Sequence, residues 1–158
     1  MSEEKPKRMA IIASKGSMDD AYPPVILAST AAAFDMEVAI FFTFYGLNLV
    51  HKKKLKKLKV SPVGNPAMPM PIPQWIAMLP GMTWMATKMM KRWMGKANVA
   101  KFEELLEACI EADVKLIACQ MTMDVMGIKR EDLIDDLEVG GAATFLEFAQ
   151  DADITLFM

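Results

Sequence analysis

Apolar residues in this chain form short continuous runs that alternate with helical stripes. Residues 9–14 are a continuous apolar run, as expected for a strand buried on both faces of a parallel sheet, and residues 114–119 indicate a buried strand that ends on a cysteine. Residues 36–44 are rich in β-branched and aromatic side chains, and residues 154–158 form a last apolar run, so both predict strands. Strands that alternate with helices in this way predict a three-layer α/β/α domain with a mainly parallel sheet of four to five strands.

The first half of the chain carries two predicted helices. Residues 25–34 are almost all apolar and indicate a helix that lies on the sheet, with Pro23 and Pro24 in its first turn, where proline is tolerated. In residues 47–58, apolar side chains fall roughly on one face and lysines fill most of the remainder. This pattern predicts a basic amphipathic helix, whose lysines either stay solvated or form a docking face for an acidic partner.

Three more helices are predicted in the second half. Residues 99–113 are amphipathic, and Cys109 is among the side chains expected to face the core. Residues 120–126 follow a predicted strand directly and form a short helix ended by Gly127. Residues 142–149 form the last helix, which leads into the final strand.

Residues 60–98 differ in composition from the rest of the chain. Residues 60–73 contain five prolines, which exclude helix and central strand and leave room only for a short edge strand near residues 60–63. We therefore predict a single domain over residues 1–158, with a polar leader at 1–8 and an insertion-like segment at 60–98.

The second part of that segment is rich in methionine and holds all three tryptophans. One helical face is expected to carry Met82, Met85, Met89 and Trp93. Such a face either covers the core or forms an oligomer interface. Two further interpretations are peripheral binding to a membrane surface, with Lys88 among the polar side chains, and capture of copper(I) by thioethers.

Composition narrows the class of protein. The formal net charge of −2 gives no general attraction to nucleic acid, so no nucleic-acid partner is expected. Two cysteines cannot form a disulfide framework, and the polar first eight residues lack the apolar run of a signal peptide. The apolar residues 75–87 are interrupted by Pro80-Gly81 and fall short of the ~20 residues that a spanning helix needs. We therefore expect a soluble protein in a reducing cytoplasm.

Cys119 is the candidate for chemistry. It ends a predicted strand just before a helix begins, which is where open parallel sheets bind ligands and where backbone N–H groups favour a thiolate. The amides of the residues that follow are expected to stabilise the sulfur anion, and these candidate binding residues are Gln120, Met121, Thr122 and Met123.

The loops after the first two strands are expected to reach the same crevice. They add Lys15, Gly16, Thr43 and Tyr45 as candidate binding residues, and Lys15 is expected to place a positive charge beside the thiolate. The single histidine, His51, lies in the lysine-rich segment, so a Cys–His catalytic pair is poorly supported. The chain lacks a zinc quartet, a P-loop, a dinucleotide fingerprint and a Cys-x-x-Cys pair, so no metal and no cofactor is expected and the mechanism would use one thiol.

Several segments together carry a family resemblance. The most specific is the cysteine- and methionine-rich block ACQMTMDVMG at residues 118–127. The others are the Ser14-Lys15-Gly16 loop, residues 41–47, and the closing stretch from Gly140-Gly141 to residues 155–157. Over nearly its whole length the chain resembles the DsrE/DsrF-like superfamily, specifically its DsrE2-type branch.

That resemblance implies a DsrEFH-like fold, usually in homo-oligomers, and a role in sulfur trafficking. It implies that Cys119 carries sulfane sulfur as a persulfide, received from or passed to rhodanese-like or TusA-like partners. The chemistry agrees, because an exposed thiolate can attack a sulfane sulfur, hold it and surrender it to another thiolate. We therefore predict a sulfur carrier or sulfurtransferase that acts through Cys119. The alternative is a non-catalytic module that docks a partner or a membrane surface through its Met/Trp-rich and Lys-rich segments.

Overall fold

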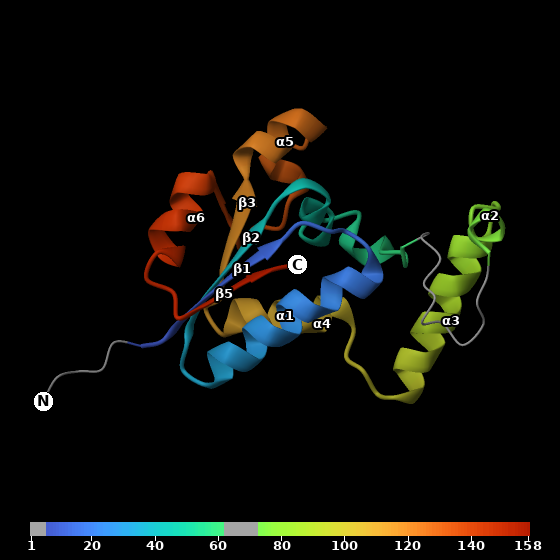
Figure 1. The fold of residues 1–158 in the computed structure, drawn as a ribbon, viewed down its shortest axis with the longest axis horizontal. Coiled ribbons are helices and arrows are strands. Elements are labelled where there is room, and N and C mark those ends of the chain that lie inside the picture. Colours follow the sequence, from blue (N-terminus) through green and yellow to red (C-terminus); the bar gives the residue numbers. More distant parts are fainter. Residues whose placement is uncertain (1–5, 62–72) are drawn as a thin grey trace, which may run out of the picture.

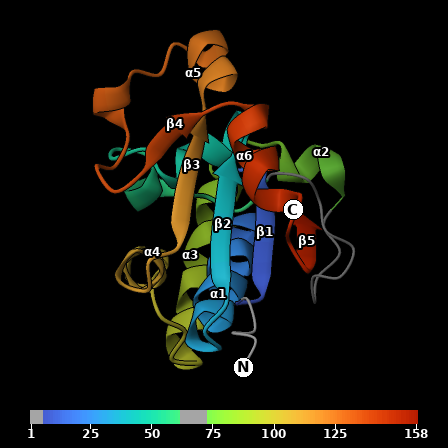
Figure 2. The same cartoon turned by 90° about the vertical axis from the view of Figure 1, so that its left-hand side faces the viewer.

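Five parallel strands form the centre of the structure, a computed structural model that describes residues 6–61 and 73–158. They lie in the order β4-β3-β2-β1-β5, and every pairing is parallel (Figure 2). The strands are β1 (Arg8–Ala13), β2 (Glu37–Phe42), β3 (Lys115–Cys119), β4 (Glu138–Gly140) and β5 (Ile154–Phe157).

Helices cover both faces of this sheet (Figure 1). On one face α1 (Met18–Ala33) packs against β1, β2 and α4 (Phe102–Glu111). On the other face α6 (Ala142–Ala149) packs against β1, β2 and β4. Helix α5 (Gln120–Met126) extends from the carboxyl end of β3. The predicted three-layer α/β/α fold is confirmed.

The two faces bury cores of different size. The larger core lies between the sheet and the α1–α4 layer, and its strand residues include Ile11, Ile40 and Leu116. The smaller one lies under α6 and consists of Ala10, Phe41, Ile117, Cys119 and Phe145. Because neighbouring residues of a strand point to opposite faces, the last residue of β3 projects toward α6. Its thiol therefore belongs to the smaller core.

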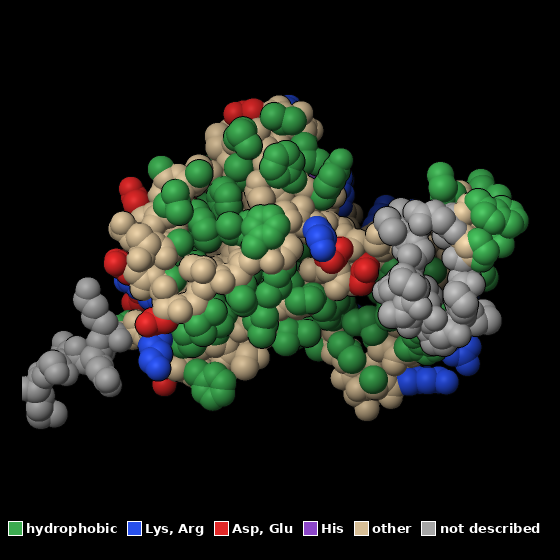
Figure 3. Space-filling model, viewed as in Figure 1, with side chains coloured by type: hydrophobic (Ala, Val, Ile, Leu, Met, Phe, Trp, Pro, Cys, Tyr) green, Lys and Arg blue, Asp and Glu red, His purple; other side chains and the backbone are tan. Residues whose placement is uncertain are grey.

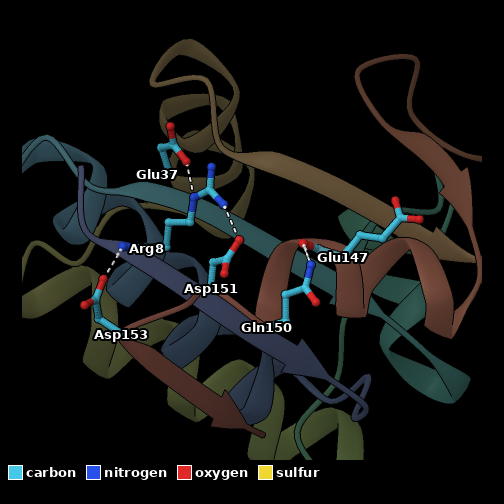
Figure 4. A network of polar contacts seen from close by, with 6 residues as sticks. All are labelled: Arg8, Glu37, Glu147, Gln150, Asp151 and Asp153. Carbon is cyan, nitrogen blue, oxygen red and sulfur yellow. Dashed lines mark hydrogen bonds and ion pairs between the residues drawn. The ribbon is translucent and has the colours of Figure 1, made fainter. Parts of the chain in front are cut away.

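Arg8 anchors the opposite end of the sheet (Figure 4). Its guanidinium pairs with Glu37 of β2 through Nε and with Asp151 through Nη1 at 3.6 Å. Its backbone N–H donates to the carboxylate of Asp153 at 2.8 Å. These contacts tie β2 and the loop before β5 to the start of β1, and they leave the carboxyl ends of the strands free for loops.

The predicted amphipathic helix over residues 47–58 is wrong. The structure has two short 3-10 helices there, η1 (Phe44–Leu49) and η2 (Leu55–Lys57). Between them His51 forms an antiparallel bridge with Leu133, and the backbone N–H of Lys52 donates to the carbonyl of Asp132 at 2.9 Å. The backbone here pairs with the segment around η3 (Arg130–Asp132) in place of forming helical hydrogen bonds.

Helix α1 begins at Met18, earlier than predicted, so Pro23 and Pro24 lie in its interior and not in its first turn. Proline has no N–H, and the helix therefore lacks the two backbone hydrogen bonds that these positions would donate. Packing offsets the loss, because Pro24 is among the most fully buried side chains of the protein.

The Met/Trp-rich segment forms α2 (Gln74–Ala77) and α3 (Met82–Lys96), which lie to one side of the α/β body (Figure 1). Thr87 of α3 is buried, and Met90 and Met94 pack against the larger core. The predicted apolar face is not the one that covers the core, since Met85 and Trp93 are exposed. Apolar side chains gather at the far end of the α2–α3 pair (Figure 3), and their role in oligomers or at membranes stays a prediction.

The structure differs from the predicted strands in three places. The three-residue strand β4 was not predicted, and Val60 and Ser61, where an edge strand was expected to begin, are not in a strand. The remainder of that expected strand, and most of the proline-rich connection, lie outside the described residues. Strand β2 ends at Phe42, two residues early, because Phe44 takes a left-handed backbone conformation with φ of 46° and starts η1.

Candidate functional site

Cys119 lies where a strand changes into a helix. It is the last residue of β3 and the N-cap of α5, and its neighbour in the sheet register is Gly140 of β4. The first N–H groups of a helix have no partner inside the helix, so the amides that follow Cys119 are available to an anion. The predicted strand-to-helix junction is confirmed, and Gly127 ends α5 in the left-handed conformation that was expected of it.

The thiol itself is covered. The Cys119 side chain is 4% exposed and shares the smaller core with Phe41 and Phe145. The two rings stack with 5.2 Å between their centroids. The prediction of an exposed thiol is therefore wrong for this conformation, because Cys119 is packed in the smaller core, to which α6 contributes Phe145.

Two of the candidate binding residues meet beside this junction. The hydroxyl oxygens of Thr43 and Thr122 lie 3.2 Å apart, and the Thr122 hydroxyl oxygen also accepts the backbone N–H of Phe44 at 3.1 Å. These contacts join the end of β2 to the first turn of α5. They also hold Phe44 in its left-handed conformation, which is strained for a residue other than glycine.

The other residues of α5 are divided between surface and core. Met121 is exposed, and Gln120 is exposed with its amide donating to the Asp124 carboxylate at 2.8 Å. Met123 is buried in the larger core. Its side chain therefore packs in a different core from the thiol, which lies in the smaller one.

Lys15, Gly16 and Tyr45 lie together, but away from the thiol. They line one open cavity at the carboxyl ends of β1 and β2, and Cys119 is not among the residues that line it. Since β1 and β3 flank β2, their ends are about 10 Å apart. Lys15 Nζ pairs with the carboxylate of Asp20 at 3.4 Å, so the structure does not bring its charge to the thiol.

Comparison with known proteins shows the family to which this chain belongs. The model of the DsrE/DsrF/DrsH-like family matches residues 5–157. The chain belongs to this family. It is 54% identical over 158 residues to the protein named sulfur carrier protein DsrE2 of Allochromatium vinosum, with 96% of this chain and 98% of that protein covered. It is also 36% identical to the uncharacterized protein YrkE of Bacillus subtilis over 158 residues, covering 98% and 99% of the two chains.

Solved structures support the fold of this family member. The ychN protein of E. coli matches with a TM-score of 0.55 at 13% identity, covering 96% of this chain and 99% of that chain. MTH1491 of Methanobacterium thermoautotrophicum, titled a protein of unknown function, matches with a TM-score of 0.54 at 9% identity and the same coverage. Within the part of the chain that the structure describes, no helix is long and apolar enough to cross a membrane.

Cys109 has the opposite surroundings to a reactive thiol. It is fully buried in α4, and its Sγ–H donates to the carbonyl of Val25 in α1 at 3.4 Å. Burial raises the pKa of the Cys109 thiol to about 11, because the apolar surroundings disfavour the thiolate. Its predicted role in packing is confirmed.

This raised pKa predicts a pH-dependent contribution to stability. Below about pH 9 the thiol is neutral in both states, whereas between pH 9 and about 11 only the unfolded chain ionises. The free energy of unfolding should therefore fall by roughly 2–3 kcal/mol over that window. Urea unfolding of the wild type and of Cys109→Ala at pH 8 and pH 11 measures the difference; equal losses in both proteins would contradict the assignment.

Sequence reasoning missed the aromatic residue of α6 that shares the smaller core with Cys119. Phe145 was part of a predicted helix, but the pattern gave no indication that this helix crosses to the thiol's side of the sheet. A short strand, β4, directs it there, and Gly140 permits the turn because a Cβ at that position would lie 2.9 Å from the Thr144 side chain. His51, by contrast, lies in the bridge to Leu133, where its Nδ1 accepts the backbone N–H of Lys53 at 3.2 Å.

Proposed function

We propose that this protein is a sulfur carrier in the cytoplasm that holds sulfane sulfur as a persulfide on Cys119 and exchanges it with partner thiols. The observation that carries the proposal is the position of Cys119 as the last residue of β3 and the N-cap of α5. A thiolate there meets the unpaired amides of the first helical turn and the positive end of its dipole. The relative that bears the name sulfur carrier protein matches over nearly the whole chain and supports the same role.

The proposed transfer is an exchange between thiolates. The Cys119 thiolate attacks the terminal sulfur of a donor persulfide or polysulfide, a new S–S bond forms, and the donor leaves as its thiolate. In the second step an acceptor thiolate attacks that same outer sulfur, and Cys119 is released as a thiolate. Each step makes one S–S bond and breaks one, so no external oxidant or reductant is needed. A second cysteine is not required either.

Access to the thiol is part of this proposal. With the side chain 4% exposed, a donor reaches Cys119 only when the cover provided by α6 shifts. A persulfide adds one sulfur at about 2.05 Å beyond Sγ, which also requires space under Phe145. Burial in this form would protect a loaded persulfide from small thiols until a partner displaces the cover. Partners of the rhodanese-like or TusA-like kind, and assembly into a homo-oligomer, are the expected settings for that displacement.

Mass spectrometry tests the proposal. The reduced protein is incubated with inorganic polysulfide, freed of excess reagent, and measured intact and as peptides without reductant. We expect added sulfur on the peptide that contains Cys119, its removal by dithiothreitol once the protein is unfolded or digested, and no added sulfur in Cys119→Ser. Cys109→Ala is the matched control and should load like the wild type. Full loading of Cys119→Ser, or sulfur only on Cys109, would sink the proposal.

A further inference from the structure

A second feature lies at the carboxyl ends of β1 and β2, beside the thiol's junction and separate from it. It is an open cavity of 520 Å³, within the range of small-molecule sites. Its walls come from the loop after β1 with the start of α1, from η1, and from the segment around η2. Four of its lining residues are lysines, namely Lys15, Lys54, Lys57 and Lys59.

The charge of this cavity is opposite to that of the chain. Among the described residues that line it, Asp20 is the single acidic one, so four lysines and one aspartate give +3, on a chain whose formal net charge is −2. The Asp20 carboxylate is already engaged, since Ser17 donates to it at 2.6 Å and Lys15 lies 3.4 Å away. Like charges gathered around a concave surface repel one another, and an anion relieves that repulsion.

Close packing fixes the loops that form the walls. A Cβ on Gly16 would run into the carbonyl oxygen of Tyr45 and lie 3.0 Å from the side-chain nitrogen of Asn48. Lys54 Nζ donates to the Asn48 side chain at 3.0 Å, which links the segment around η2 to η1. The first turn of α1, a helix of 16 residues, borders the cavity at Ser17 and adds the positive end of its dipole.

We propose that this cavity binds a small polyphosphate ligand of the nucleoside di- or triphosphate class. The lysines would hold the phosphate groups, while Tyr45, whose side chain is 66% exposed on the cavity wall, offers a ring for stacking with a base. The volume exceeds the need of a bare oxyanion. The chain has no P-loop, so the site relies on lysine side chains from two loops in place of a ring of backbone amides.

Calorimetric titration of the full-length protein with ATP tests the proposal. We expect saturable binding of one ATP per chain that weakens with rising salt, as charge pairing requires. The double variant Lys54→Glu/Lys57→Glu should weaken binding by at least about tenfold, since each lysine contributes a charge-assisted hydrogen bond. Absence of binding up to millimolar ATP would overturn the proposal.

The lysine-rich segment supplies its own matched control. Lys53 and Lys56 are exposed neighbours of the same type, but neither lines this cavity. Lys53→Glu/Lys56→Glu makes the same change in net charge and should alter the affinity less than about threefold, the scale of screened surface charges. If both double variants weakened ATP binding equally, the attraction would be a diffuse one to a basic surface. That result would overturn the proposal of a specific site in this cavity.

Two further titrations separate the kind of ligand. Tyr45→Ala should weaken ATP several-fold and leave inorganic tripolyphosphate unchanged, whereas Tyr45→Phe should restore ATP binding. Unchanged ATP affinity in Tyr45→Ala would overturn the nucleoside part of the proposal. A poly-glutamate peptide that binds more tightly than ATP and depends on Lys54 and Lys57 would assign the cavity to an acidic protein partner instead. None of these readouts involves sulfur loading of Cys119, so the two proposals fail independently.

Discussion

Gly46→Ala is expected to remove most of the stability of the fold. A Cβ at Gly46 would collide with the carbonyl oxygen of Ala13 and lie 2.8 Å from its carbonyl carbon, and both are backbone atoms of β1. The strand cannot yield without breaking its pairing with β2 and β5. We expect a loss of at least about 4 kcal/mol in the free energy of unfolding, a value reserved for changes that force the backbone to move. Urea unfolding followed by circular dichroism measures it.

Gly95→Ala is the control, because its expected effect on the free energy of unfolding is zero or stabilising. Gly95 lies inside α3, and a Cβ there would meet no atom within 4 Å. Because glycine is the less favourable residue in a helix, this variant should be equal to the wild type or more stable by up to about 1 kcal/mol. If the free energy of unfolding of Gly46→Ala were within about 1 kcal/mol of the wild-type value, the backbone of η1 around Gly46 would be free to move away from β1. That result would also remove the structural basis for the rigid cavity walls.

The sequence predicted which side chains are buried more reliably than it predicted the conformation of the backbone. In residues 47–58 the four apolar positions Leu47, Val50, Leu55 and Leu58 are all buried and the lysines are exposed, as the helical pattern required. The helix did not form because distant residues supply its hydrogen-bond partners: Ile134 donates to the Val50 carbonyl at 3.0 Å. A pattern of apolar residues records which side chains face inward and contains nothing about partners that lie about 80 positions away.

The candidate site likewise has a part that the sequence predicts and a part that it does not. The local junction at Cys119 was predictable because a buried strand, a cysteine and a short helix follow one another directly in sequence. Lys15 was predicted to lie beside the thiol only because both residues follow parallel strands. Two strand widths separate its loop from the thiol, because β2 lies between β1 and β3. The cover over the thiol depends on β4, which has only three residues and too little length to show a strand pattern. Local chemistry was visible in the sequence, whereas its accessibility depends on tertiary packing.

Phe145→Ala is expected to uncover Cys119. The Phe145 ring is 6% exposed, stacks on Phe41 and shares the smaller core with the thiol. Its removal should lower the free energy of unfolding by about 3–5 kcal/mol and leave a cavity next to Sγ. Cys119 should then react with iodoacetamide at least about tenfold faster in the native protein, since access limits the wild-type rate. Peptide mass spectrometry at several time points measures each cysteine separately.

Two comparisons distinguish local uncovering from general loosening. Leu146→Ala changes the adjacent residue of α6, whose side chain is 59% exposed, and should alter stability by less than about 0.5 kcal/mol and the Cys119 rate hardly at all. Cys109, buried in the other core, serves as the internal standard within each sample. If Phe145→Ala accelerates both cysteines equally, the thiols react through global unfolding. A rise confined to Cys119 means that the α6 cover controls the thiol, and the same movement is then available to a partner that delivers or removes sulfur.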